Sequence, residues 1–338
     1  MKIITSKIIL STLLATLFLM MLLTNFDSFV LRYFKSPPFF AEFYIPQAIL
    51  TVPEKLNPDV IFVGGSSLRE YFEHDDFLSR SLSSRCGRNL EAFNGATSSQ
   101  SLVDSLAIVD SILKRGGSPQ LVVVGLTKFR LSNFWPEWQN VLDQQRLALP
   151  PPEVLVNYLP FFSRVKFRAN NRFARFSRVT PLIRLGDFFT DQDYVYEKPL
   201  YLSEPLSVEK KRERSLLANI MRQQMFEDYS VENAKRYRIL FEDYKRYGIE
   251  IVFVFTPKAP STQFLNVNDR EYLKLVTNIL GTVGPVIDLD EVSSLPEEAF
   301  FDEQHLVPMG RELLRSRDRQ SRKLHRLICK SDTGDWEG

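Results

Sequence analysis

Short apolar runs alternate with helix-type patterns over most of the chain beyond residue 58. The runs have the length and composition of β-strands: Val60–Val63, Asn89–Phe93, Leu121–Val124, Ile249–Phe255 and Val286–Leu289. Helical spacing of apolar residues falls between or after them: Ser101–Lys114, Val231–Tyr247, Arg270–Gly281 and Gly310–Leu327. The third strand, and the fourth from Ile251 onward, are continuously apolar, which is typical of parallel strands covered on both faces. The pattern predicts an α/β fold, a doubly wound three-layer sandwich around a parallel sheet, with ligands at the carboxyl ends of the strands.

The N-terminus carries a different pattern. No charged residue occurs from Ile8 to Phe26, and Leu, Ile, Met and Phe dominate this run. Its length is what a helix needs to cross a bilayer core, so we expect one transmembrane anchor at residues 8–26. A cleaved signal peptide is the alternative, although no clear small-x-small cleavage site follows. Lys2 and Lys7 precede the run, and this bias favours a cytoplasmic segment 1–7, a juxtamembrane linker 27–58 and an exported domain.

A long insertion, about residues 128–230, exceeds what the alternation of strands and helices requires. We therefore expect a main domain of residues 59–127 and 231–316, followed by a basic helix end and a mobile tail at 317–338. Within the insertion, the run 161–186 has no acidic residue, and phenylalanines alternate with its basic residues: Phe162, Phe167, Phe173 and Phe176 with Arg164, Lys166, Arg168, Arg172, Arg175, Arg178 and Arg184.

This basic run has two readings. It could be a solvated helical excursion whose aromatic side chains pack on the core, or a surface for anionic lipid headgroups or an anionic polymer. The insertion as a whole could also form an acceptor groove or a lid over an active site.

Composition narrows the classes of function. The formal net charge is +2, so no global attraction to nucleic acid is implied. The chain has no metal-type Cys/His spacing, phosphate-cradling Gly-Lys-Ser/Thr loop or dinucleotide fingerprint, and we expect neither a metal nor a cofactor. Cys86 and Cys329 could form a disulfide in an exported protein, but a distant pair does not identify a redox compartment. His325 lies in a basic helical stretch and is expected to be solvated.

Two short segments at opposite ends of the main domain carry the candidate chemistry. Asp302 stands three residues before His305, ahead of the last helix, so its carboxylate can orient the imidazole as a base. Ser66 and Ser67 follow the first strand and a glycine turn and supply hydroxyl groups. Each segment also has a structural reading, because glycine-serine turns often only close a turn and aspartate is a favoured helix N-cap. Their order along the chain and their position beside strands favour a nucleophile, base and carboxylate set.

These segments resemble the first and last sequence blocks of the SGNH (GDSL-like) hydrolase superfamily, over about residues 59–316. In that family a Gly-Asp-Ser block follows the first strand, and an Asp-x-x-His block precedes the final helix. Here Gly65-Ser66-Ser67 occupies the first block, with serine in place of the aspartate, and Asp302 and His305 occupy the last. The resemblance implies a flavodoxin-like sandwich in which Ser67 is the nucleophile, His305 the base and Asp302 the group that orients it.

The middle blocks of the family are matched less closely. The second block, whose glycine N–H points into the oxyanion hole, falls here on Gly95 or Ser99. The third block, normally Gly-x-Asn-Asp, reads Gly125-Leu126-Thr127-Lys128, so the side-chain amide of the oxyanion hole is missing. One such donor is worth about 10²–10³ in rate. Thr127 or backbone N–H groups would take its place, and the expected backbone donors are those of Ser67, Gly95 and Ser99. The expected pocket residues are Arg69, Thr127 and Lys128.

The layout of an anchor before such a domain resembles accessory proteins that modify exported polysaccharides or teichoic acids. It implies a serine acyl-enzyme that O-acylates (acetylates) a cell-surface polysaccharide on the periplasmic or extracytoplasmic side of a bacterial envelope. The alternatives are a carbohydrate or lipid esterase and a catalytically inactive scaffold for a membrane-bound O-acyltransferase. The expected partners are the lipid bilayer through residues 8–26, an exported glycan or acylated small substrate, and as a further option a membrane-bound O-acyltransferase; nucleic acid is not expected.

Overall fold

The fold is built on a sheet of parallel strands. The computed structural model describes residues 11–16, 45–46, 48–49, 56–72, 75–97, 100–127, 131, 145–147, 149–165, 205–225, 231–262, 267–289, 295–317 and 319–330. The strands are β1 (Val60–Gly64), β2 (Ala92–Asn94), β3 (Leu121–Leu126), β4 (Glu250–Phe255) and β5 (Val286–Asp288). They form a five-stranded sheet in the order β2-β1-β3-β4-β5, and every pairing is parallel. The predicted parallel sheet is therefore confirmed.

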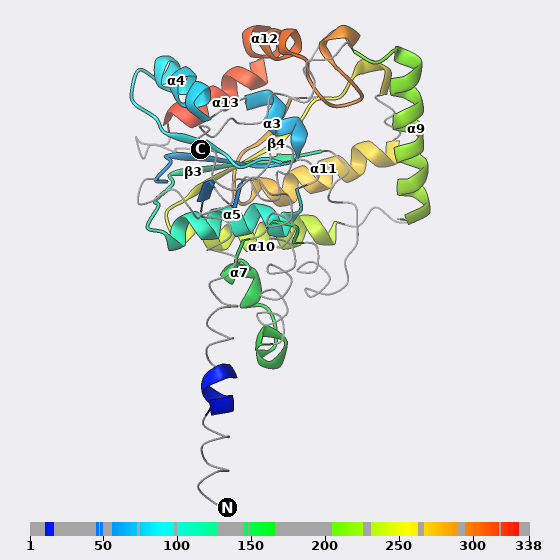
Figure 1. Ribbon diagram of the computed structural model, residues 1–338. Helices are drawn as coiled ribbons and strands as arrows, with labels where there is room; N and C mark the ends of the chain where they lie inside the picture. Colours follow the sequence, from blue (N-terminus) through cyan, green and yellow to red (C-terminus); the bar gives the residue numbers. More distant parts are fainter. Residues whose placement is uncertain are drawn as a thin grey trace, which may run out of the picture.

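Helices cover both faces of this sheet and make the sandwich three-layered (Figure 1). One face carries α5 (Leu102–Lys114), α10 (Glu232–Lys245) and α11 (Val267–Gly281). The other carries α3 (Ser66–Phe72), α4 (Asp75–Cys86), α12 (Pro308–Arg317) and α13 (Arg319–Lys330). Successive strand residues point to opposite faces, so Ile61 and Val63 pack in the first core while Val60 and Phe62 pack in the second. All four are fully buried, which explains why the strands read as continuous apolar runs.

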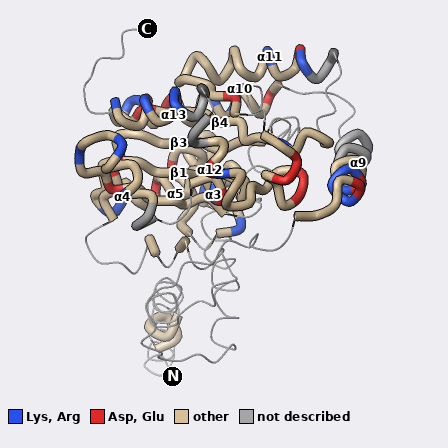
Figure 2. The backbone as a smooth tube through the Cα atoms, turned by 90° about the horizontal axis from the view of Figure 1, so that it is seen from above, with Lys and Arg blue, Asp and Glu red and all other residues tan. Residues whose placement is uncertain are grey.

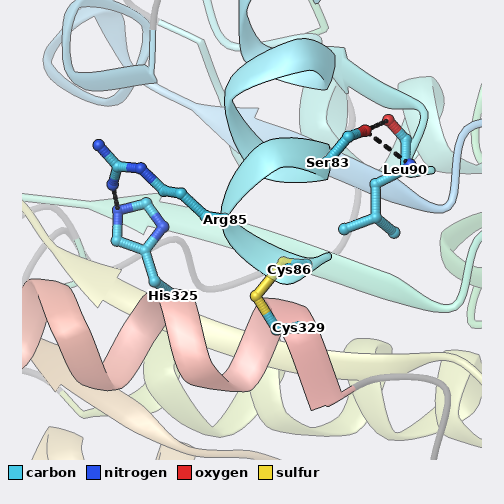
Figure 3. Close-up of a disulfide and its surroundings, with 6 residues drawn as sticks. All are labelled: Ser83, Arg85, Cys86, Leu90, His325 and Cys329. Carbon is cyan, nitrogen blue, oxygen red and sulfur yellow. Dashed lines mark hydrogen bonds between the residues drawn. A yellow bond between two sulfur atoms is a disulfide. The ribbon is translucent and has the colours of Figure 1, made fainter. Parts of the chain in front are cut away.

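Most predicted elements lie close to their observed positions, and the differences have local causes. Strand β2 begins after Leu90, whose N–H and carbonyl oxygen both pair with the Ser83 hydroxyl of α4 instead of a strand (Figure 3). Ser79, one turn earlier on α4, pairs in the same way with Ala92. These serines satisfy the outer edge of the sheet, which would otherwise present unpaired groups. The single helix expected at Gly310–Leu327 is instead α12 and α13, which the structure describes as separate elements.

The insertion adds two short helical segments and one long helix to the sandwich. The part of it that the structure describes contains α7 (Glu153–Val156), a helical stretch at 161–165 and α9 (Val208–Met225). Phe162 is 85% exposed, so the reading in which the phenylalanines pack on the core is wrong for this residue. The remainder of the predicted basic run, from residue 166 onward, lies outside the described residues.

Little of the predicted anchor is described. Residues 11–16 are helical and exposed, while the rest of the expected span 8–26 lies outside the described residues. Within the part of the chain that the structure describes, no helix combines the length and apolar character needed to cross a membrane. Further along, Ile45 and Ile49 are buried in the core that α5 and α10 share.

A disulfide joins the two ends of the second helical layer. Cys86, at the end of α4, is bonded to Cys329, near the end of α13 (Figure 3). One turn from Cys329, His325 is not simply solvated as expected, because the Arg85 guanidinium donates to its Nε2 at 2.8 Å. The bond closes a link between positions 243 residues apart, so it holds the C-terminal helix against the first half of the domain.

Candidate active site

Helix α3 presents a serine directly beyond the end of β1. The chain leaves β1 through Gly64, which has a φ of +144°, and α3 begins two residues later at Ser66. Gly64 is paired in register with Gly125 of β3, and a Cβ on Gly64 would lie 2.5 Å from the Gly125 carbonyl oxygen. Only a glycine combines this φ with such a close approach. The turn therefore sets Ser66 where β1 is flanked by β2 and β3, the point at which the strand order reverses and where doubly wound sheets bind ligands.

Ser66, His305 and Asp302 form a continuous hydrogen-bonded chain. Ser66 Oγ lies 2.7 Å from His305 Nε2, and His305 Nδ1 lies 2.8 Å from both carboxylate oxygens of Asp302. All three residues are buried, and Ser66 retains 9% exposure. Because a carboxylate accepts hydrogen bonds, His305 donates its Nδ1–H to Asp302, which leaves the lone pair of Nε2 to accept from the Ser66 hydroxyl.

The residue identities agree with the sequence analysis at two positions and differ at the third. The predicted contact between Asp302 and His305 is present. The hydroxyl that reaches His305 belongs to Ser66, so the expected pairing of His305 with Ser67 is corrected by one residue. Ser66 and Ser67 are consecutive in a helix, where each step turns the side chain by about 100°, and only one of them can face the imidazole. Family spacing alone could not show this shift, because Gly64-Gly65-Ser66 and Gly65-Ser66-Ser67 both read glycine-x-serine.

The Asp302 carboxylate is organised by its own loop. Its Oδ1 accepts from the backbone N–H groups of Gln304 and His305, each at 3.0 Å. Burial acts to raise the pKa of Asp302, but the hydrogen bond and charge of His305 and the two backbone N–H groups outweigh it and hold the pKa below its ordinary value. Asp302 is therefore ionised in the neutral pH range, and its carboxylate can stabilise positive charge on the ring of His305.

A buried glutamine connects the loops around Ser66. Gln100 Oε1 accepts from the N–H of Gly64 and from the Ser105 hydroxyl, and its Nε2 donates to the Gly95 carbonyl oxygen at 2.7 Å. Thr97 N–H donates to the Gly64 carbonyl oxygen at 3.0 Å. The end of β1 is thus hydrogen-bonded to the loop that follows β2, which fixes the backbone that leads into Ser66.

Two of the three expected oxyanion donors, Gly95 and Ser67, lie within the described residues. The Gly95 N–H donates to the Phe62 carbonyl oxygen at 2.8 Å, so it extends the pairing of β1 with β2 and does not point into the site as expected. Ser99 lies outside the described residues. The N–H of Ser67 falls in the first turn of α3, where a helix offers no acceptor of its own. Among the described candidates, Ser67 is therefore the remaining backbone donor beside the Ser66 hydroxyl.

Of the expected pocket residues, Arg69 and Thr127 lie within the described residues. Arg69 is buried, and its Nη2 lies 2.8 Å from Glu70 Oε1 in an ion pair within α3. Arg311 of α12 donates to the Glu70 carbonyl oxygen at 3.1 Å, which ties the helix that follows His305 to the helix that begins with Ser66. Arg69 is therefore part of a buried cluster of charged side chains that connects α3 to α12. Thr127 is half-buried just after β3, and Lys128 lies outside the described residues.

Helix α9 and the segment before it reach the catalytic loop, although no motif in the sequence indicated this. Arg214 Nη1 of α9 lies 3.8 Å from Asp302 Oδ2, and the N–H of Leu206, two residues before α9, donates to the Phe301 carbonyl oxygen at 2.8 Å. No sequence motif marked either residue, because both contacts join the insertion to a loop far along the chain.

A hollow of about 810 Å³ lies at the opposite edge of the sheet. Asn57, Arg80 and Glu91 are among its lining residues, and it adjoins the segments that lead into β1 and β2. These segments are at the amino ends of the strands, away from Ser66, so the hollow does not belong to the candidate site. Within the described residues, no group of three or more His, Cys, Asp or Glu side chains is arranged to hold a metal ion.

Comparisons with known proteins returned no relative that would identify the chemistry. A scan of the sequence against models of protein families gave no match, and a search among curated proteins likewise gave none. Function must therefore be inferred from the geometry of Ser66, His305 and Asp302.

Proposed function

We propose that this protein is a serine acyl-transfer enzyme of SGNH-like type, with Ser66 as nucleophile, His305 as general base and Asp302 as the carboxylate that orients it. The observation that carries the proposal is the chain of hydrogen bonds from Ser66 Oγ through the imidazole to Asp302. A buried carboxylate, imidazole and hydroxyl in line are the parts required to activate a serine.

The chemistry proceeds in two halves. Ser66 Oγ attacks an ester or thioester carbonyl while its proton passes to His305 Nε2, and the tetrahedral intermediate carries a negative oxygen that the Ser67 N–H can stabilise. Collapse breaks the bond to the leaving group, which takes the proton from His305, and the acyl group remains on Ser66. An acceptor hydroxyl then attacks the acyl-enzyme and gives its proton to His305. Collapse breaks the bond between the acyl group and Ser66 Oγ, the acceptor leaves with the acyl group, and His305 passes the acceptor's proton to Ser66 Oγ.

The acceptor distinguishes the candidate reactions. A sugar hydroxyl as acceptor gives O-acylation of a glycan, our first choice, whereas water gives an esterase. Glycan O-acylation is the first choice because the layout of an anchor before such a domain resembles accessory proteins that modify exported polysaccharides. An extracytoplasmic position is supported by the disulfide between Cys86 and Cys329, because such bonds persist mainly in oxidising compartments.

A catalytically inactive scaffold is the second candidate. The segment after β3 reads Gly125-Leu126-Thr127 and supplies no side-chain amide for the oxyanion. In that case the domain would bind a glycan or a membrane-bound O-acyltransferase without reacting.

The test compares p-nitrophenyl acetate turnover by the full chain with that of Ser66→Ala, Ser67→Ala and His305→Ala proteins, together with intact mass to detect an acetyl adduct. We expect the Ser66 and His305 variants to lose at least about 10³-fold in kcat/KM, since a triad acts as a unit. Ser67→Ala keeps its backbone N–H and should retain most of the activity and the adduct. Equal inertness of all four proteins, also with a thioester donor, would favour the scaffold. Loss of activity in Ser67→Ala and His305→Ala, with Ser66→Ala still active, would restore the assignment made from family spacing.

A further inference from the structure

Helix α9 is fastened to the loops that carry the triad. The Lys211 side chain is only 1% exposed, and its Nζ donates to the Glu297 carbonyl oxygen at 2.8 Å and lies 3.3 Å from Glu297 Oε1. Glu297 also accepts from the N–H and hydroxyl of Ser261, so the 3₁₀ turns η1 (Pro260–Thr262) and η2 (Glu297–Ala299) meet under α9. A lysine is buried only when its charge is paired. This contact therefore holds helix α9 of the insertion against the catalytic region.

Arg214 lies on the same face of α9. It follows Lys211 by three residues, which places the two on one side of a helix, and its neighbour Ser215 is buried with its hydroxyl 3.5 Å from the Thr262 carbonyl oxygen. The Arg214 side chain remains 53% exposed. The contact made by Lys211 thus holds the solvent-accessible guanidinium of Arg214 beside Asp302.

The contact with Asp302 involves only Nη1 of Arg214, so the rest of the guanidinium can bind another group. At 3.8 Å it is an ion pair longer than a hydrogen bond. The Asp302 oxygens already accept from the His305 ring and from two backbone N–H groups. Among the described residues, Asp302 is the only acidic side chain within ion-pair distance of Arg214. A solvent-exposed ion pair of this kind contributes little, whereas the planar guanidinium can bind a carboxylate or phosphate through two parallel hydrogen bonds.

We propose that Arg214 binds an anionic group of the substrate, a carboxylate or a phosphate, beside the loop that carries Asp302 and His305. The proposal deepens the acyl-transfer function and rests on it: the substrate class becomes an acidic glycan, with the charge of a uronate or sugar-phosphate unit bound by Arg214 while the glycan reacts at Ser66. Figure 2 shows that α9 carries both basic and acidic residues along the rim of the molecule, so the recognition depends on the position of Arg214 and not on a broad basic patch.

The experiment measures competitive inhibition of p-nitrophenyl acetate turnover by the full chain. Glucuronate, glucose 6-phosphate and glucose share one ring and differ in carboxylate, phosphate and neutral substituents. We expect Arg214→Ala to raise the inhibition constants of the anions about tenfold or more, which corresponds to losing a charge-assisted hydrogen bond. The inhibition constant of glucose should remain unchanged, and kcat/KM for the neutral ester should fall by a much smaller factor than the anions lose, because Arg214 also contacts Asp302. Arg214→Lys should lie between the wild type and Arg214→Ala. The anion that is inhibitory at lower concentration identifies a uronate or a phosphate as the source of the charge.

Arg212→Ala is the matched control. Arg212 is exposed on the same helix, two residues and about 200° away from Arg214, so it should leave every constant as in the wild type. Two outcomes would overturn the proposal. In one, the anions inhibit no better than glucose. In the other, Arg214→Ala lowers turnover of the neutral ester as much as it weakens the anions, which would make Arg214 a positioning residue that acts through Asp302.

A binding arm separates failure of the inference from failure of the acyl-transfer function. Calorimetry with glucuronate and glucose 6-phosphate uses the Ser66→Ala protein with and without Arg214→Ala. Anion binding that disappears with Arg214 supports the inference even if Ser66 proves irrelevant to turnover. If both proteins bind the anions equally, Arg214 is not the site, whatever the kinetics show.

Discussion

At the scale of single residues, Asp302 performs two tasks with one carboxylate. It receives the Nδ1–H of His305, and it closes its own loop by accepting the N–H groups of Gln304 and His305. The spacing of three residues between Asp302 and His305 makes both possible, because a short turn returns the chain to the carboxylate. The orientation of the base is therefore set by contacts within its own loop.

This arrangement predicts a pH-dependent contribution of Asp302 to stability. Its pKa in the folded protein is lowered, so its stabilising effect is fully present above the unfolded-state pKa of about 4 and disappears as pH falls through the folded-state pKa. Compared with Asp302→Asn, the wild type should be more stable at neutral pH, and the difference should shrink in acid. Urea unfolding of both proteins at about pH 7, 5 and 3 measures this difference. A gap that stays constant or widens in acid would contradict the assigned direction of the pKa shift.

At the scale of elements, the approach of β1 to β3 determines where α3 can begin. Gly64 and Gly125 are paired at the carboxyl ends of these strands. A Cβ on Gly125 would lie 2.6 Å from the Leu68 Cβ, so α3 packs against the backbone of β3 at that position. Two glycines thus allow the helix that carries Ser66 to lie directly over the strand ends.

Replacing Gly64 by alanine should therefore disturb both stability and the site. The new Cβ meets the backbone of Gly125 at a φ that side chains rarely adopt, and we expect a destabilisation of roughly 2–4 kcal/mol. Because Ser66 is only two residues away, kcat/KM for p-nitrophenyl acetate should fall as well. Chemical denaturation and steady-state kinetics provide the two readouts.

Gly281→Ala is a suitable control for this substitution. A Cβ there has no heavy atom within 4 Å, the φ is not positive, and the residue ends helix α11. Its stability should be unchanged or slightly higher, since alanine restricts the unfolded chain. Equal behaviour of Gly64→Ala and Gly281→Ala would show that the strand ends tolerate more separation than their geometry indicates.

At the scale of the whole molecule, a covalent bond connects the beginning and the end of the fold. Cys86 and Cys329 are separated by 243 residues, and the loop they close includes β2 to β5 and the catalytic loop. Helix α13 buries only part of its surface, through side chains such as Leu324 and Ile328. This apolar contact is limited, and the disulfide therefore attaches α13 covalently to the domain.

Reduction should lower the stability of the whole domain. Closing so long a loop restricts the unfolded chain by up to about 5 kcal/mol, so the thermal midpoint should fall clearly in the presence of dithiothreitol. The Cys86→Ser/Cys329→Ser protein should unfold at this lower temperature with or without reductant. If the wild type is insensitive to full reduction, as verified by thiol titration, the bond does not contribute to stability.

Local features of the fold were accessible from the sequence alone. The continuous apolar runs at β3 and β4 determined that these strands are covered on both faces, and Ser101 with Asp104 forms the capping box that starts α5 near the predicted position. The Asp302–His305 contact belongs to the same class, because it spans only three residues. Each of these depends on the preferences of neighbouring residues, which the order of amino acids expresses directly.

Only the tertiary structure decided which serine faces His305, which cation faces Asp302, and that Cys86 meets Cys329. Ser66 and Ser67 have the same side chain and adjacent positions, so no local preference separates them. The choice follows from the rotation of α3 after the Gly64 turn, and Arg214 arrives on a helix of the insertion. Such contacts join residues that are distant along the chain, and they are determined by the path of the backbone and the packing of whole elements rather than by the pattern of any one segment.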